Sequence, residues 1–168
     1  MNKPAQAAKA ETKSEKAPRD DGASPDALVD ALYESLSFEP GSQPDWQRLR
    51  SLFLPQARIV PPQERRSAPV EAIDLETYIA RLRPGVEAPA IAASGVQEID
   101  AARNVVEFGN LAHVLSSTET IVGPEDAEPV ARGINSLQLA RSLGRWWIVS
   151  FLWDTERPDN PLPPGYLP

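Results

Sequence analysis

The single histidine of the chain, His113, is the side chain best suited to acid–base chemistry. An unperturbed imidazole has a pKa near 6.5, so it can serve as a general base or a general acid at physiological pH. His113 lies in the middle of an apolar run, where a histidine can equally be a hydrogen-bonded structural or interface residue. A neighbouring carboxylate would favour catalysis, and the candidates are Glu98, Glu119 and Asp154.

Asp154 is the second candidate catalytic residue, because it shares one end of a predicted hairpin with Asn135. Polar groups that converge on an apolar concavity form small-molecule sites, and desolvation there would raise the pKa of a carboxyl. The alternative is that Asp154 lies at a strand end in solvent. Arg132 would bind a carboxylate or, as most strand arginines do, form an ion pair at the surface or at an interface.

Several classes of site are excluded by what the sequence lacks. The absence of cysteine excludes disulfides, thiolate metal sites and cysteine nucleophiles, and a single histidine excludes two-histidine metal motifs. No glycine-rich phosphate loop and no nucleophile elbow occurs. A net charge of −7 argues against nucleic-acid binding by phosphate neutralisation. We therefore predict no metal, no cofactor and no nucleic-acid partner.

The first half of the chain is predicted to be mainly helical. Ser24, Pro25 and Asp26 combine a capping residue, a proline suited to the first helical position and an acid that favours the helix N-terminus. Apolar residues recur after them at helical spacing. The predicted elements are helices from Ser24 to about Glu39, from Pro44 to Leu54 and from Asp74 to Pro84-Gly85, with a short strand at Ala57 to Val60.

The second half is predicted to be a four-strand antiparallel meander. Its strands run from Val96 to Glu107, Leu111 to Val122, Val130 to Ala140 and Arg145 to Thr155. Gly109-Asn110 and Leu143-Gly144 supply the hairpin turns. Helices followed by strands indicate the α+β class, in which helices pack on one face of a sheet.

The last hairpin is apolar on both faces. With unbroken alternation from Leu143-Gly144, Trp146 and Ile148 share one face with Leu152, whereas Trp147, Phe151 and Trp153 share the other. A half-buried strand normally has one polar face, so the second face is either covered within the domain or meets another chain. We predict the latter, a homodimer with an interface formed by Trp147, Phe151, Trp153 and Arg132.

Four motifs carry a resemblance to a known superfamily: Asp45-Trp46-x-x-Leu49-x-x-Leu52-Phe53, Phe108 to Val114, Arg132 to Leu139 and Arg145 to Ser150. Together they resemble a bacterial subgroup of the nuclear transport factor 2-like, or SnoaL-like, superfamily. The resemblance implies a cone-shaped α+β fold, three N-terminal helices packed on a curved, mostly antiparallel sheet, and usually a homodimer. It also implies a pocket between the helices and the concave sheet. The superfamily contains both enzymes and non-catalytic binding domains, so its fold does not determine a function.

Two functions remain open at this stage. The first is a small-molecule-binding or accessory domain that acts as a homodimer and holds a small hydrophobic ligand in a pocket lined by Trp46, Tyr78, Asn135 and Trp146. The second is a metal-free lyase or isomerase that acts on a small hydrophobic substrate through His113 and Asp154. We favour the first slightly, because the sequence shows no complete acid–base set.

The ends of the chain differ from its middle. Residues 1–23 lack apolar periodicity and are predicted to form a disordered tail, and residues 24–156 form the domain. Residues 157–168 contain five prolines and form a tail that either lies along the domain or is loose. No apolar run approaches the roughly 20 residues of a membrane helix, and no signal-peptide core is present. We therefore expect a cytoplasmic protein without membrane contact.

Overall fold

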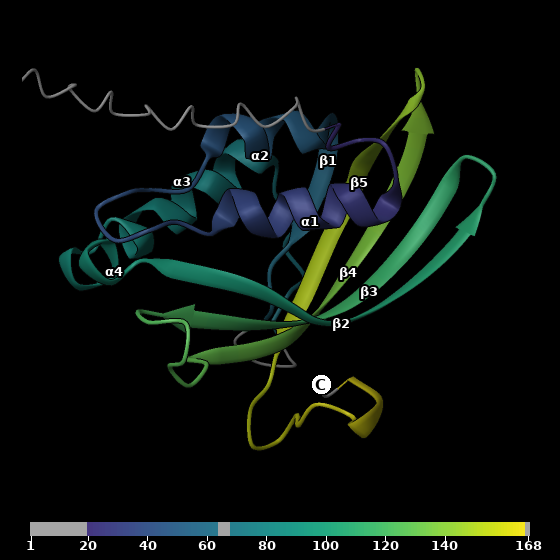
Figure 1. Ribbon diagram of the computed structural model, residues 1–168. Coiled ribbons are helices and arrows are strands. Elements are labelled where there is room, and N and C mark those ends of the chain that lie inside the picture. The colour runs from purple at the N-terminus through teal and green to yellow at the C-terminus, as the bar shows by residue number, and fades with distance from the viewer. Residues whose placement is uncertain (1–19, 64–67, 167–168) are drawn as a thin grey trace, which may run out of the picture.

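Helices precede most of the sheet, in the order that the sequence predicts. The computed structural model describes residues 20–63 and 68–166, and its helices cover one face of a curved sheet (Figure 1). The elements are α1 (Pro25–Leu36), α2 (Trp46–Leu52), β1 (Phe53–Val60), α3 (Leu75–Val86), α4 (Pro89–Ser94), β2 (Val96–Phe108), β3 (Leu111–Val122), β4 (Ala131–Ser142) and β5 (Arg145–Thr155). The predicted α+β class is confirmed. Within the described residues, no helix has the length and apolar character needed to cross a bilayer.

The three longest helices start at a capping side chain. Ser24 accepts a hydrogen bond from the backbone N–H of Ala27 at 3.0 Å, and Asp45 and Asp74 cap α2 and α3 in the same way. The predicted starts at Ser24 and Asp74 are confirmed. The predicted end of α3 at Pro84-Gly85 is one residue short, since the helix continues to Val86. Helix α4 was not predicted.

The sheet has the strand order β1-β5-β4-β3-β2. The predicted antiparallel meander of β2 to β5 is confirmed, and β1 joins it by pairing with β5 in parallel. The core lies between the helices and the concave face. Leu28, Leu32, Leu49, Leu137 and Ile148 are completely buried in it.

A β-bulge in β5 overturns the predicted faces of the last hairpin. Trp146 pairs with Arg141 and Ile148 with Leu139 as expected, but Ser150 pairs with Gln138 and leaves Val149 without a partner. The extra residue reverses the alternation beyond it. Phe151 therefore faces the helices and is 3% exposed, and Trp153 packs beside it against the core. The predicted common face of Trp147, Phe151 and Trp153 is wrong, and Trp147 alone of these three stays opposite the helices.

A second bulge lies in β2. Asp100 pairs with Thr118 and Ala102 with Ser117, so Ala101 is the inserted residue. Asp100 and Arg103 are three residues apart and would point to opposite faces of a regular strand. The insertion places both on the face that carries α1, where they form an ion pair.

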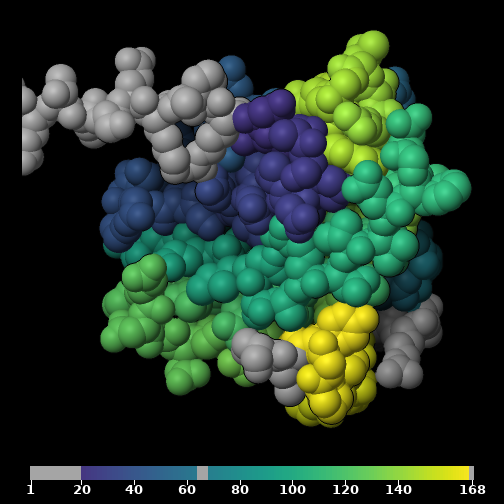
Figure 2. All heavy atoms as spheres, turned by 45° about the vertical axis from the view of Figure 1, so that its right-hand side comes forward, coloured from purple at the N-terminus to yellow at the C-terminus, as the bar shows by residue number. Residues whose placement is uncertain are grey.

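Both ends of the described chain contact the domain. The carbonyl of Gly22 accepts a hydrogen bond from the N–H of Trp146, and Asp21 pairs with Arg48. Asp21 and Gly22, which fall in the predicted tail, thus contact the domain, and residues 1–19 of that tail lie outside the described residues. After β5 the chain passes to the side of the sheet opposite the helices (Figures 1 and 2), where Leu162 and Tyr166 are half-buried.

Candidate functional site

A cavity of about 170 Å³ lies between the helices and the concave face of the sheet. Helices α1 and α3 cover it, and β2 to β5 form its floor. Its wall includes Tyr33, Tyr78, Glu98, Asn135, Phe151 and Trp153. The cavity thus combines aromatic surface with a few polar groups, the composition that small-molecule sites have.

Three aromatic rings form one wall of the cavity. The ring of Tyr78 meets Phe151 edge-on at 6.2 Å and Trp153 at 5.7 Å between centroids. Phe151 and Trp153 stack at 5.0 Å. Tyr78 comes from α3, whereas the other two rings reach this face only because of the bulge at Val149. The bulge in β5 therefore builds the aromatic wall.

Glu98 of β2 is the carboxyl group of the cavity. The hydroxyl of Thr120 on the neighbouring strand donates to its two carboxylate oxygens, at 3.1 and 3.2 Å. Burial raises the pKa of Glu98 to about 7, and the hydrogen bond from Thr120 offsets only part of this effect. Glu98 can therefore gain or lose a proton close to neutral pH, which an exposed glutamate cannot do.

Two further polar groups border the cavity without a complete set of protein partners. Tyr78 is 6% exposed, and within the described residues its hydroxyl makes no hydrogen bond. Burial, with a smaller contribution from the negative charge of Glu98, raises the pKa of Tyr78 above its ordinary value, so the hydroxyl stays a donor at neutral pH. The side-chain amide N–H₂ of Asn135 donates a hydrogen bond to the hydroxyl of Tyr33, and the side-chain carbonyl oxygen of Asn135 has no partner in the described part of the chain.

The hydroxyl of Tyr33 fixes the orientation of Asn135. Asn135 Nδ2 donates to Tyr33 Oη at 2.9 Å. Ser116 Oγ donates to the carboxylate of Asp100 at 2.7 Å, which leaves Ser116 to accept from Tyr33 at 2.7 Å. The hydrogen bonds thus run in one direction, from Asn135 to Asp100. Burial raises the pKa of Tyr33 to about 12, so the phenol remains protonated.

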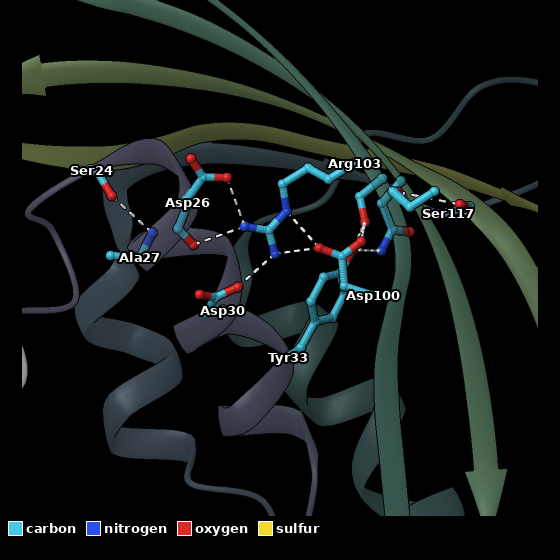
Figure 3. A network of polar contacts seen from close by, with 11 residues as sticks. Ser24, Asp26, Ala27, Asp30, Tyr33, Asp100, Arg103 and Ser117 are labelled. Atoms are coloured by element: carbon cyan, nitrogen blue, oxygen red, sulfur yellow. Dashed lines mark hydrogen bonds and ion pairs between the residues drawn. The ribbon is translucent and has the colours of Figure 1, made fainter. Parts of the chain in front are cut away.

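Arg103 closes this network at the surface of the domain. Figure 3 shows its guanidinium between Asp100 of β2 and two aspartates of α1. It pairs with Asp100, with Asp30 at 2.7 Å and with Asp26 at 3.0 Å. Arg103 is 14% exposed and Asp100 17%, so their ion pair is less screened than an ordinary surface pair, whereas Asp26 and Asp30 are mostly exposed. The network anchors α1 to β2 and thereby holds the cover of the cavity in place.

A wider open hollow lies beside the cavity. It has a volume of about 770 Å³ and is bordered by the α1–α2 loop, α4, the start of β2 and the β3–β4 loop. Glu39 and Glu125 contribute its charges, and Glu98 borders both this hollow and the cavity. Glu98 therefore lies where the hollow and the cavity meet.

Comparison with known proteins gives matches in structure only. No protein-family model and no curated protein sequence matches the chain. An NTF-2 like protein of unknown function from Silicibacter pomeroyi is similar in structure, with 20% sequence identity and a TM-score of 0.52. The match covers 78% of this chain and 92% of that protein. An NTF2-like protein from Cytophaga hutchinsonii has 13% identity and a TM-score of 0.53, and the match covers 77% of this chain and 96% of that protein. The chain has a nuclear transport factor 2-like fold.

Another structure with this fold similarity is the Kfla4162 protein from Kribbella flavida, at 14% identity and a TM-score of 0.57, with 77% of this chain and 86% of that chain covered. Identities this low show the fold of a nuclear transport factor 2-like domain and nothing about its ligand. The superfamily resemblance of the sequence is thereby confirmed at the level of fold.

Two of the four predicted pocket residues border the cavity. Tyr78 and Asn135 lie in its wall. Trp46 and Trp146 do not border it but lie in the hydrophobic core, 7% and 2% exposed. The prediction failed for them because a large aromatic at a buried position fills the core as readily as it lines a pocket.

The two predicted catalytic residues lie outside the cavity. His113 faces away from the helices, where its Nε2 lies 3.1 Å from Ser136 Oγ. Asp154 also faces away from the helices, is about half exposed and pairs with Arg157 at 2.7 Å. None of the three carboxylates proposed as partners contacts the ring of His113. The two residues therefore do not form one site, and neither reaches a ligand in the cavity.

Arg132, which was predicted at the dimer interface, also faces away from the helices. Its guanidinium pairs with Glu119 on the neighbouring strand at 2.8 Å. Glu98 was overlooked as a centre of chemistry, since it was named solely as a partner for His113. Its signal in the sequence is weak, because Glu98 is an acid near the start of a predicted strand and a second acid, Asp100, follows two residues later. The network of Tyr33 and Arg103 was not predicted either.

Proposed function

We propose that this nuclear transport factor 2-like domain binds a small hydrophobic molecule in the cavity between α1, α3 and the concave sheet. The observation that carries this proposal is a cavity whose polar groups, the hydroxyl of Tyr78 and the carbonyl of Asn135, lack partners in the described chain. Both groups border the cavity, so a ligand inside it can hydrogen-bond to them directly in place of water.

The proposal is tested by ligand-observed NMR with a panel of small cyclic compounds and by mass spectrometry of the protein under native conditions. We expect retained or added ligands to compete for one site and to quench the fluorescence of Trp153, which borders the cavity. The variant Asn135→Leu fills the space and removes the free carbonyl, so it should weaken binding at least tenfold. Leu143→Asn, at the exposed tip of the β4–β5 hairpin, is the matched control. Binding that survives in Asn135→Leu would remove the cavity from consideration.

The domain is further proposed to act as a homodimer through the face of the sheet opposite the helices. Leu115, Ser136 and Leu152 form a row across β3, β4 and β5 on that face. On the same face, Ile134 lies beside this row on β4 and Trp147 lies further along, towards the β4–β5 turn. Leu152 is 38% exposed. Apolar surface that continues over three strands is typical of an interface.

Sedimentation analysis tests the dimer. Leu152→Glu places a charge in the centre of this face and should weaken association by at least tenfold, whereas Leu143→Glu, 98% exposed at the hairpin tip, should leave it unchanged. A wild-type protein that remains monomeric at micromolar concentration would contradict the proposed dimer.

Glu98 supports a second candidate function, a metal-free isomerase or lyase. A general base is most effective when its pKa lies near the working pH, and the pKa of Glu98 is about 7. Its carboxylate would accept a proton from the carbon next to a carbonyl group, and the hydroxyl of Tyr78 would donate a hydrogen bond to the resulting enolate oxygen. Glu98 takes the part that the sequence assigned to His113 and Asp154.

Hydrogen–deuterium exchange of cyclohexanone in D₂O, followed by NMR, tests this activity. Catalysed exchange should increase as the pH rises through about 7, because the ionised carboxylate is the base. Glu98→Gln should abolish it and Glu125→Gln, a change at the rim of the hollow, should not. Equal exchange in the wild type and in Glu98→Gln would leave only the binding function.

A further inference from the structure

The charges that face the cavity are unbalanced. Glu98 is the one carboxylate in its wall, and no cationic side chain of the described residues pairs with it. Arg132 also borders the cavity, but its guanidinium pairs with Glu119 on the opposite face. The cavity therefore contains a desolvated acid without a counter-charge.

Aromatic rings lie around this acid. The rings of Tyr78, Phe151 and Trp153 form one wall, with 5.0 to 6.2 Å between the centroids of neighbouring rings. The negative charge of Glu98 is close enough to this wall to raise the pKa of the Tyr78 hydroxyl. A cation is attracted to the faces of aromatic rings within about 6 Å, and this attraction is larger where water is excluded. The same rings offer nothing comparable to an anion.

The approach to the cavity is also acidic. Glu39 and Glu125 contribute the charges of the neighbouring hollow, which Glu98 borders as well. Among the residues that line this hollow in the described chain, none is basic. A hollow with one sign of charge raises the local concentration of ligands of the opposite sign and repels those of its own.

We propose that the ligand of the cavity is a small organic amine, with its ammonium group bound by the Glu98 carboxylate and its apolar part against the rings of Tyr78, Phe151 and Trp153. This inference rests on the proposed binding function and specifies its ligand class. The cavity volume of about 170 Å³ is close to that of cavities of about 150 Å³ that accept benzene, so the apolar part is about one six-membered ring in size.

An amine ligand makes binding depend on pH in one direction. The titratable groups that face Glu98 are Tyr33 from α1 and Tyr78 from α3, with the paired Arg132 from β4 and the exposed Glu39 and Glu125 at the rim. Both tyrosines have a raised pKa and keep their protons below pH 8. If the ammonium binds the ionised carboxylate, affinity rises by about thirty-fold from pH 5.5 to pH 8.0 for a carboxyl with a pKa of about 7.

The experiment compares three probes of similar shape in the full chain by isothermal titration calorimetry. Benzylamine carries a positive charge, benzyl alcohol none and benzoate a negative one. Each is titrated at about pH 5.5 and at about pH 8.0 into the wild type, Glu98→Gln, Tyr78→Phe and the surface control Glu107→Gln, an exposed glutamate of β2 outside the hollow and the cavity. Circular dichroism at both pH values verifies that every variant is folded.

We expect benzylamine to bind most tightly at the higher pH, to lose at least tenfold in affinity in Glu98→Gln and to lose its pH dependence there. Tyr78→Phe should retain the amine, because the ring face remains. Glu107→Gln, which lies outside both the hollow and the cavity, should change affinity by less than threefold. Benzyl alcohol or benzoate that binds as tightly as benzylamine at the higher pH would overturn the amine while leaving the binding function in place. An absence of binding by all three probes, together with no retained ligand, would overturn both.

Discussion

The raised pKa of Glu98 predicts how the stability of the protein varies with pH. A carboxyl whose pKa is higher in the folded state keeps its proton there while the unfolded chain loses it. Below about pH 4.5 both states are protonated and the group has no effect. As the pH rises from 4.5 to about 7, the folded state becomes less favourable, and above that both states are ionised. The rise from 4.5 to about 7 corresponds to a loss of about 3 kcal/mol.

Glu98→Gln removes this penalty and keeps the shape of the side chain. We therefore expect the variant to gain about 3 kcal/mol of stability relative to the wild type between pH 4 and pH 8. Urea unfolding followed by far-ultraviolet circular dichroism measures this difference at several pH values. Carboxylates elsewhere titrate alike in both proteins and cancel in the comparison.

The matched control is Glu125→Gln, an exposed glutamate at the rim of the hollow. Its stability relative to the wild type should stay constant within about 0.5 kcal/mol over the same pH range. A constant difference for Glu98→Gln as well would show that water reaches the carboxyl freely. That result would refute the desolvated cavity on which the ligand arguments depend.

Four further variants test the packing of the domain by urea unfolding. Gly133→Ala would bring a Cβ atom within 2.5 Å of the carbonyl oxygen of Asp154 and should destabilise the fold by more than about 1 kcal/mol. Gly85 lies in helix α3 with open space around it, and Gly85→Ala should stabilise the fold by up to about 1 kcal/mol. Ser24→Ala removes the N-cap of α1 and should cost about 1 kcal/mol. Tyr33→Phe leaves two buried hydrogen-bonding groups without their partner and should cost about 1 to 3 kcal/mol.

Local signals in the sequence were sufficient for most of the elements. Ser24 and Asp74 are capping residues at the starts of two helices, and Leu143-Gly144 forms the predicted turn, with φ values of 52° and 82°. Helix α4 was missed because six residues are too few for apolar periodicity to appear, although Pro89 at its first turn is a usable start signal. The parallel pairing of β1 with β5 depends on contacts distant in sequence and has no local signal.

The two bulges explain why the site was less predictable than the fold. An inserted residue carries no mark in the composition of a strand, yet it reverses every side chain beyond it. Without the insertion at Val149, Phe151 and Trp153 would join Trp147 on the open face and enlarge the predicted interface. With it, they leave that face and form the wall of the cavity. The same single residue therefore removes two aromatic side chains from the proposed dimer surface and supplies them to the proposed ligand.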